Sequence, residues 1–216
     1  MPHSLQRPLA AVAILFFVGA LVGTAGDQIH VQFHVLDYAH PYLLGQAFWV
    51  PLLFGCAGLV MVHSHRIVRP RSPTDGPRAT TLIVPFLLFA AAYFATGIFK
   101  DSPRALTAAL SLAWLLRVAI APSVEKVFSG IAFAVCGSLF EAALSSTGAF
   151  RYLVPNGIGG NGESGALGGI GVPVWLPALY LHVSLLTRSI YLYGLHAIAA
   201  PSRTEQANAS LARRLG

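Results

Sequence analysis

The first apolar stretch is followed by a group of four residues whose side chains can ligate a metal ion. Asp27, His30, His34 and Asp37 are separated by three, four and three positions. On a continuous helix this spacing would place all four side chains along one face, and carboxylates and imidazoles bind zinc and other divalent ions. A solvated loop between two membrane spans also needs polar residues, and we favour that interpretation over a metal site.

A second candidate for chemistry is a carboxylate inside an apolar stretch. Glu141 lies several residues from the end of the stretch 127–147. An ionised carboxylate within a membrane span costs at least ~2–3 kcal/mol, so it should face protein or a cavity. His182, in the stretch 172–195, lies at a similar depth and could contact it. Glu141 could line a ligand pocket, make a structural hydrogen bond between helices, or act with His182 as acid and base.

The glycine-rich segment 155–171 contains a formal nucleotide-binding motif. Gly157, Gly159 and Gly162 spell G-x-G-x-x-G. That motif binds dinucleotides only between a strand and a helix of a βαβ unit. An apolar stretch and Pro155 precede the glycines here, so the sequence predicts a flexible connector and no nucleotide cofactor.

The elements that must position these residues are six apolar stretches. The chain has 216 residues, of which 55% are hydrophobic and 10% are charged, whereas soluble domains carry roughly 25% charged residues. Each stretch is close to the ~20 residues with which a helix crosses ~30 Å of hydrocarbon. We therefore expect an all-α, polytopic membrane protein with a single six-helix transmembrane domain over residues 1–216. The expected transmembrane helices are residues 8–26, 43–62, 82–98, 105–121, 127–147 and 172–195.

The basic residues predict the orientation of these helices. With the N-terminus in the cytoplasm, the cytoplasmic segments hold nine Lys and Arg residues and the opposite loops hold three. This excess is typical of the cytoplasmic side, so we expect both termini and the tail 196–216 in the cytoplasm, and the glycine-rich loop outside a cell membrane. No aromatic residues interleave with the basic ones as a nucleic-acid groove requires. The net charge of +6 therefore indicates contact with the lipid bilayer rather than with nucleic acid.

Prolines and glycines are placed to shape the bundle. Pro51, Pro85 and Pro177 lie within the expected spans, where each removes a backbone donor and can kink its helix. Gly19 and Gly23 form a small-xxx-small pair, which allows close helix approach within the chain or between chains of a homo-oligomer. We favour packing within the chain.

Three short motifs, at residues 48–52, 148–152 and 174–177, resemble those of the Insig family, the six-span sterol-regulatory proteins of the endoplasmic reticulum and their bacterial relatives. Residues 48–52 read Phe-Trp-Val-Pro-Leu, with Gly55 following, and are similar to the Insig Trp-Trp-Val-Pro-Pro. Residues 148–152 read Gly-Ala-Phe-Arg-Tyr, where Insigs show Gly-x-Tyr-x-Tyr. Residues 174–177 read Val-Trp-Leu-Pro, against Ser-Trp-Leu-Pro. Span number and order agree, so the resemblance covers nearly the whole chain.

The resemblance implies an Insig-like bundle with a lipid-binding cavity inside the membrane, without a cofactor and without catalysis. Insigs bind oxysterols and hold a partner membrane protein by its spans. They carry a polar Thr-Gln pair near the position of Glu141, which implies a polar group facing the pocket. The residues expected to contact lipid are Phe48, Trp49, Pro51, Gly55, Phe140, Glu141, Phe150, Tyr152, Trp175, Tyr180 and His182.

Two departures from the family pattern bear on the ligand and the partner. Residues 119–123 contain no Asp, whereas Insigs carry one in this loop for partner binding, which argues against a Scap-like partner. The abundance of Arg, Ala and Gly indicates a GC-rich bacterial genome, and bacteria usually lack sterols. A neutral glycerolipid such as diacylglycerol then suits a cavity lined by aromatic residues with one or two polar groups.

The sequence therefore leaves three classes of function. The first, which we favour, is a non-enzymatic membrane protein that binds a neutral lipid, diacylglycerol-like or sterol-like, as a sensor or regulator. The second is an intramembrane enzyme or carrier that uses Glu141 and His182, or a metal at the four residues Asp27, His30, His34 and Asp37. The third is a scaffold that only packs against other membrane proteins.

Overall fold

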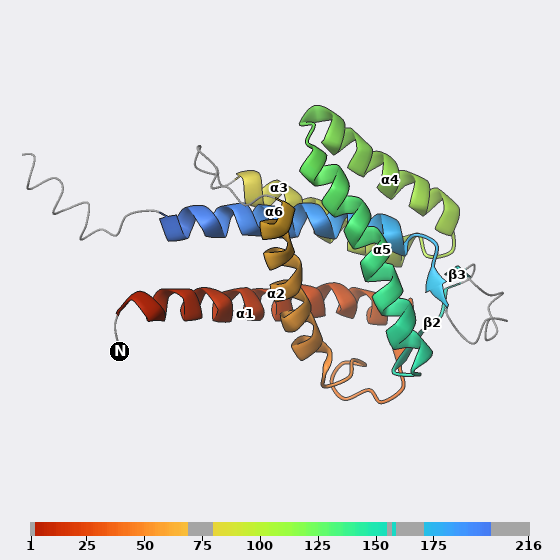
Figure 1. The fold of residues 1–216 in the computed structure, drawn as a ribbon. Helices are drawn as coiled ribbons and strands as arrows, with labels where there is room; N and C mark the ends of the chain where they lie inside the picture. Colours follow the sequence, from red (N-terminus) through yellow and green to blue (C-terminus); the bar gives the residue numbers. More distant parts are fainter. Residues whose placement is uncertain (1–2, 69–79, 155–156, 159–170, 200–216) are drawn as a thin grey trace, which may run out of the picture.

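The protein is a helical bundle with short strands at one end (Figure 1). The computed structural model describes residues 3–68, 80–154, 157–158 and 171–199. Nearly all of the expected glycine-rich connector, and the tail beyond residue 199, lie outside these ranges. The helices of the described residues are α1 (His3–Gln32), α2 (Val50–Val68), α3 (Thr80–Ile98), α4 (Pro103–Ile120), α5 (Val124–Ser146) and α6 (Leu176–Ala199).

Five of the six helices are long and apolar enough to cross a membrane, and α6 is not among them. α6 instead lies at the centre of the bundle, in contact with α2, α3, α4 and α5 (Figure 1). A helix surrounded by protein can carry polar residues that lipid would exclude, and α6 buries His182, Ser184, Thr187 and Ser189. The all-α membrane bundle expected from the sequence is confirmed.

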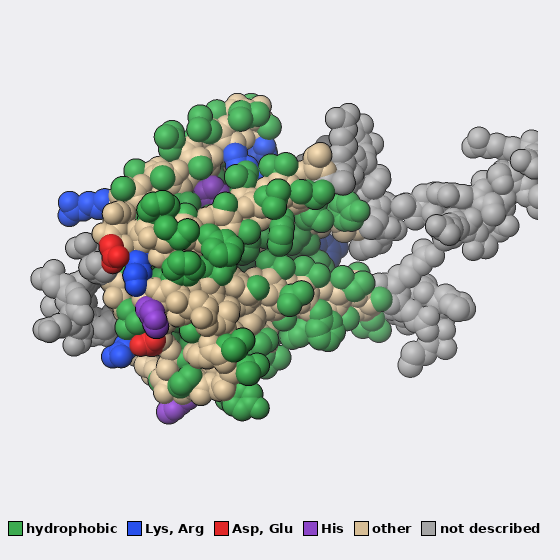
Figure 2. Space-filling view, turned by 180° about the vertical axis from the view of Figure 1, so that it is seen from behind, with side chains coloured by type: hydrophobic (Ala, Val, Ile, Leu, Met, Phe, Trp, Pro, Cys, Tyr) green, Lys and Arg blue, Asp and Glu red, His purple; other side chains and the backbone are tan. Residues whose placement is uncertain are grey.

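The outer faces of the bundle are apolar. Figure 2 shows hydrophobic side chains along the length of the molecule, with most of the charged side chains of this face at one end. Large exposed residues occur on several helices, among them Phe17, Leu52, Leu87, Leu115 and Phe128. Apolar surface on this scale is unfavourable in water, and it fits a bundle whose surroundings are hydrocarbon.

The glycines of α1 pack against α2 within the same chain. A Cβ atom on Gly58 would lie only 2.9 Å from the Cα atom of Gly19, and one on Gly23 would overlap the ring of Phe54. Only glycine allows the two backbones to come this close. The preference for packing within the chain is thus confirmed at these positions.

Two of the three prolines lie at helix starts rather than inside helices. α2 begins at Val50 and α6 at Leu176, so Pro51 and Pro177 are each the second residue of their helix. Proline is favoured there because its missing N–H has no helical acceptor in the first turn. The expectation of kinks at Pro51 and Pro177 was therefore wrong, and Pro85 lies inside α3.

The segment before α2 forms a tight turn instead of the first part of a span. Leu43 and Gln46 pair as an antiparallel bridge, with positive φ angles at Leu44 and Gly45 between them. The helix that we expected from residue 43 thus starts seven residues later.

Two small antiparallel sheets lie at the end of the bundle where α1 and α5 finish. β1 (Leu36–Tyr38) pairs with β2 (Phe150–Tyr152), so that Tyr38 lies opposite Phe150. β3 (Gly157–Ile158) pairs with β4 (Val172–Pro173), directly before α6. The strands fix the ends of α1, α5 and α6 relative to one another and thereby position the residues described next.

Candidate functional site

Glu141 lies on α5 and accepts hydrogen bonds from two tyrosine hydroxyl groups. Tyr180 of α6 donates to Oε1 at 2.8 Å, and Tyr152 of β2 donates to Oε2. Taken over all its atoms, Glu141 is only partly buried. Because a carboxylate can accept about four hydrogen bonds, these two donors leave acceptor positions for a third group.

A second carboxylate, Asp27, lies inside α1 and not in the loop that the sequence predicted. Its side chain is buried and accepts hydrogen bonds from Tyr38 at 2.8 Å and from the Gln46 amide at 2.7 Å. The same amide donates to the carbonyl of Thr24 at 3.0 Å. These contacts satisfy a polar group that would otherwise be costly in the membrane interior, and they attach the turn before α2 to α1.

His30, one turn after Asp27, is also buried in α1 and contacts α3. Its Nε2 lies 2.7 Å from the hydroxyl of Thr96. Thr96 donates its only hydroxyl proton to the carbonyl of Tyr93 at 2.7 Å, so His30 must be the donor to Thr96. The imidazole therefore carries its proton on Nε2, and its ring stacks on that of Tyr93 with centroids 4.9 Å apart.

Aromatic rings join these three groups into one site. The ring of Trp175 lies 5.5 Å from that of His30 and 6.3 Å from that of Tyr152. Phe150 lies 5.9 Å from Tyr38 and 5.5 Å from Tyr152. We call the whole set the tyrosine–carboxylate cluster. Its members are Asp27, His30, Tyr38, Gln46, Tyr93, Thr96, Glu141, Phe150, Tyr152, Trp175 and Tyr180.

Three buried donors in or beside the cluster have no hydrogen-bond partner among the described residues. They are the indole Nε1 of Trp175 and the hydroxyl groups of Ser138 and Thr24. Trp175 is fully buried, and Ser138 lies one turn before Glu141 on α5. Unpaired buried donors are rare and call for an explanation, and a bound polar group is one.

The two tyrosines on the strands remain protonated over a wide pH range. Burial raises the pKa of Tyr38 well above its usual range, and the Asp27 charge raises it further. Burial, followed by the Glu141 charge, likewise raises the pKa of Tyr152. Both phenols are therefore held as hydrogen-bond donors to the carboxylates.

The structure brings together five of the eleven residues expected to contact lipid, namely Glu141, Phe150, Tyr152, Trp175 and Tyr180. Trp49 lies at the edge of this group, with its ring 5.5 Å from that of Tyr38. Sequence reasoning missed Tyr38, Gln46, Tyr93 and Thr96. Their hydrogen bonds to Asp27 and His30 span 11 to 66 positions of the chain, and no local pattern marks such pairs.

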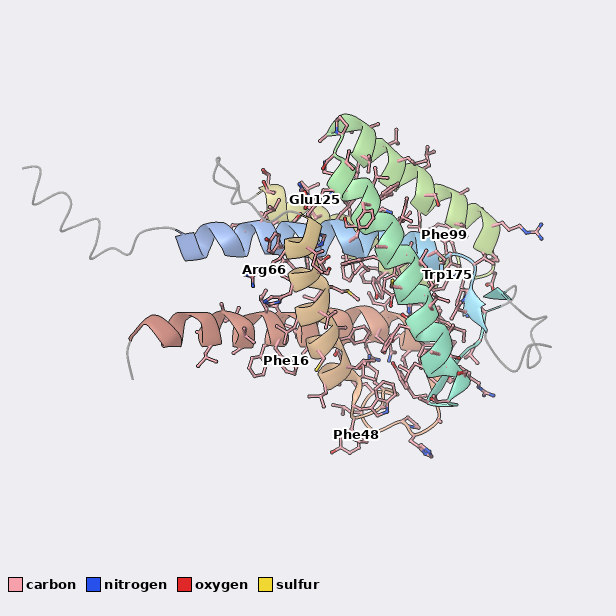
Figure 3. The ribbon with its side chains drawn as sticks, viewed as in Figure 1. Phe16, Phe48, Arg66, Phe99, Glu125 and Trp175 are labelled. Atoms are coloured by element: carbon pink, nitrogen blue, oxygen red, sulfur yellow. The ribbon has the colours of Figure 1, made fainter. Side chains whose placement is uncertain are left out.

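The other five expected residues lie apart from the cluster. Phe48 is 76% exposed and Phe140 is 50% exposed, and Figure 3 shows Phe48 at the margin of the bundle, away from Trp175. Pro51 is exposed at the start of α2. Gly55 is covered by the ring of Phe16, which lies where its Cβ would be. His182 bonds the carbonyl of Leu110 at 3.0 Å.

The contacts do not assemble the metal site or the acid–base pair that the sequence allowed. α1 ends at Gln32, and His34 has a positive φ angle of 51°, so the four candidate ligands do not share a helix face. Asp37 lies on β1, with its carboxylate 3.7 Å from Arg151. Within residues 3–68, 80–154, 157–158 and 171–199, no group of three His, Cys, Asp or Glu is placed to hold a metal. Glu141 pairs with tyrosines and not with His182.

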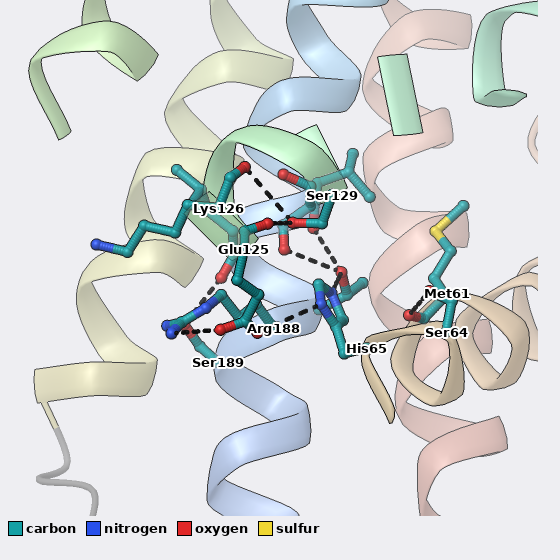
Figure 4. Close-up of polar contacts among 12 residues, drawn as sticks. Met61, Ser64, His65, Glu125, Lys126, Ser129, Arg188 and Ser189 are labelled. Carbon is teal, nitrogen blue, oxygen red and sulfur yellow. Dashed lines mark hydrogen bonds and ion pairs between the residues drawn. The ribbon is translucent and has the colours of Figure 1, made fainter. Parts of the chain in front are cut away.

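A second polar group links α2, α5 and α6 near the start of α5 (Figure 4). Arg188 donates to Glu125 at 3.1 Å. His65 lies 4.0 Å from the other oxygen of Glu125 and 3.2 Å from the hydroxyl of Thr187. All four side chains are largely buried, which indicates that this group holds three helices together.

Comparison with solved structures identifies a close architectural relative. The fold is similar to two crystal structures of MvINS, a mycobacterial Insig homolog from Mycobacterium vanbaalenii, each with a TM-score of 0.70 and 25% sequence identity. The match covers 89% of this chain and 97% of that chain. One of the two is described as a cross-linked trimer. No protein-family model and no curated protein matches the sequence.

Proposed function

We propose that this membrane protein, which has the fold of an Insig homolog, is a non-enzymatic protein that binds a neutral lipid at the tyrosine–carboxylate cluster. The observation that carries the proposal is the carboxyl group of Glu141, which Tyr152 and Tyr180 hold inside a helical membrane bundle with acceptor positions to spare. A carboxylate at such a depth is costly, and a bound hydroxyl group would use its remaining acceptor positions.

The charges and donors of the cluster favour a neutral lipid with a small polar head. The carboxyl groups of Glu141 and Asp27 accept hydrogen bonds from a hydroxyl group, and they offer a phosphate group no positive charge. The unpaired N–H of Trp175 can donate to an ester carbonyl or to the same hydroxyl. Aromatic rings such as Phe150 offer apolar contact to the body of the lipid. Diacylglycerol and a sterol share this chemistry.

The hydrogen bonds of the titratable residues favour binding over catalysis. Asp27 accepts from Tyr38 and Glu141 from Tyr152, two phenols that stay protonated, and His182 bonds a backbone carbonyl. A general base must reach the proton that it abstracts. Glu141 and His182, the acid–base pair that the sequence allowed, are bonded to other partners and not to each other. The cluster joins α1, α3, α5 and α6, so lipid occupancy can change how these helices pack. This supports a role as a lipid sensor or regulator.

Identification of the lipid that copurifies with the protein tests this proposal. Native mass spectrometry of the full chain, extracted in a mild detergent, should show a bound neutral lipid, whose class is then read by lipid extraction and tandem mass spectrometry. A diglyceride or sterol mass supports the proposal. Protein that is consistently empty, or that carries only phospholipid, contradicts it.

We also propose that the chain lies in the cell membrane with both termini in the cytoplasm and forms a homo-oligomer. The distribution of basic residues supports the orientation, and the trimer described for the mycobacterial homolog supports self-association. In a variant without the native cysteines, His34→Cys should react with an impermeant maleimide in intact cells and His63→Cys should not. Light scattering of the detergent-solubilised protein measures the oligomeric state.

A further inference from the structure

Three basic side chains meet where α4 and α5 are joined, at the opposite end of α5 from Tyr152. Arg117 lies in the last turn of α4, Lys126 in the first turn of α5, and Arg188 on α6. We call these three residues the basic cluster. Lys126 reaches back to the carbonyl of Ala121, the residue that ends α4 one turn after Arg117, and Figure 4 shows Lys126 and Arg188 on the same side of Glu125.

The basic cluster carries more positive charge than its described surroundings neutralise. Glu125 is paired with Arg188 at 3.1 Å, and Lys126 donates to the backbone carbonyl of Ala121. No described carboxylate pairs with Arg117 or Lys126. Three positive charges thus face one described carboxylate, Glu125, which is already paired with Arg188, in a region where lipid lowers the dielectric constant.

Buried N–H groups of the same cluster lack acceptors. The Nη1 atom of Arg117 and the Nε atom of Arg188 are buried without a hydrogen-bond partner among the described residues. An unpaired, partly desolvated guanidinium is unfavourable, and phosphate oxygens are the acceptors that arginine binds best. One kind of ligand would satisfy both the unpaired N–H groups and the excess positive charge, namely an anion with several oxygen atoms.

The residues that flank the basic cluster are apolar and exposed. Ile120 is 83% exposed and Val124 is 87% exposed, and Leu116 and Phe128 also point outward. A free phosphate ion gains nothing from such neighbours, whereas the acyl chains of a phospholipid pack on them while its phosphate reaches the basic groups. The surroundings therefore favour a lipid as the source of the phosphate.

We propose that the basic cluster of Arg117, Lys126 and Arg188 binds the phosphate of an anionic phospholipid at the membrane surface. This site is separate from the tyrosine–carboxylate cluster, and it takes a class of lipid to which the carboxyl groups there offer no positive charge. The two sites would hold a neutral lipid and an anionic lipid at opposite ends of α5.

Lipid titration of the full chain by native mass spectrometry tests the site. The delipidated protein is titrated with phosphatidylglycerol, with phosphatidylcholine, and with phosphatidylglycerol in the presence of inorganic phosphate. We expect wild-type protein to prefer phosphatidylglycerol, and the R117Q/K126Q variant to bind it about 25-fold more weakly, which is about 5-fold for each charge removed. The matched control K100Q/R104Q removes the same charges at the other end of α4, where Lys100 bonds the carbonyl of Phe33, and should bind like wild type.

Each other outcome counts against the proposal. Unchanged phosphatidylglycerol affinity in R117Q/K126Q, or equal affinity of the wild type for the two lipids, would overturn it. Displacement of the lipid by an equal concentration of inorganic phosphate would assign the site to a free anion. If the double variant fails to fold, R117Q alone decides the matter, because removing an unpaired charge should leave the fold intact while lowering phosphatidylglycerol affinity about 5-fold.

Discussion

The hydroxyl group of Tyr180 donates a 2.8 Å hydrogen bond to Glu141, which joins the central helix α6 to the lipid-facing helix α5. Tyr152 supplies the second donor from β2. The side chain of Tyr180 also fills the space beside Gly137, where a Cβ atom would overlap its ring. One carboxylate therefore fixes the distance between two helices and a strand, and it does so where we place the lipid head.

Loss of the Tyr180 hydroxyl should destabilise the bundle. The Tyr180→Phe variant keeps the ring but removes a hydrogen bond to the Glu141 carboxyl group, and such a bond is worth about 0.5–1.5 kcal/mol. We expect a lower thermal unfolding temperature in detergent. The control Tyr193→Phe changes a 44% exposed residue on the same helix and should alter stability by less than about 0.5 kcal/mol. Equal unfolding temperatures for the two variants would argue that the Glu141 contact contributes nothing.

A side chain at Gly58 should separate α1 from α2. Because its Cβ would lie 2.9 Å from the Gly19 Cα, Gly58→Leu inserts bulk against backbone that cannot move aside, at a cost of about 1–3 kcal/mol or more. Gly194→Ala is the control, since nothing lies within 4 Å of its Cβ position. That substitution should be neutral or stabilise α6 slightly. Thermal unfolding measures both, and a Gly58→Leu variant as stable as wild type would show that the two helices do not pack as described.

The Glu125–Arg188 ion pair should show strong coupling in a double-mutant cycle. The two side chains are only 10% and 14% exposed, so removing one partner leaves a buried charge and costs about 3–5 kcal/mol. Glu125→Gln and Arg188→Met should each be destabilising, and the double variant should be more stable than the sum of the two losses predicts. Strictly additive losses in the free energy of unfolding would indicate that the pair is not formed.

Stability should fall when the pH rises above about 10. Burial raises the pKa of Tyr38 and of Tyr152, so the folded state keeps both protons at a pH where the unfolded chain, with an ordinary tyrosine pKa near 10, has lost them. The stabilising contribution is complete below the unfolded pKa and decreases as pH rises through the folded value. Unfolding measured between pH 8 and 11 should show this decrease, and Tyr38→Phe together with Tyr152→Phe should flatten it. A profile identical to that of the double variant would contradict the burial of these phenols.

The sequence was most informative at residues whose chemistry permits few structural environments. The cost of a carboxylate in a span predicts that Glu141 turns toward protein, and its bonds to Tyr152 and Tyr180 agree with that. The close approach at Gly19 also follows from the missing side chain. The motif around Trp175 indicates the Insig resemblance, and the shared fold confirms it.

The sequence was least informative where the chain changes direction. A helix continued through Asp37 would align four metal ligands, but the chain turns at His34 and enters β1. Asp27 and His30 then find partners in β1 and α3 rather than in each other. The contact between His30 and Thr96 spans 66 positions, and such a pair follows from the packing of α1 on α3, which no local periodicity encodes.

The amount of neutral lipid that copurifies with Glu141→Leu, compared with wild type and with Ser146→Leu, tests the central claim most directly. Ser146 lies on the same helix and is exposed, so its variant controls for an added leucine. We predict that folded Glu141→Leu loses the bound diglyceride or sterol in native mass spectra while wild type and Ser146→Leu retain it. Equal lipid occupancy in all three proteins, with unfolding temperatures showing that Glu141→Leu is folded, would contradict the assignment of the lipid head to this carboxylate.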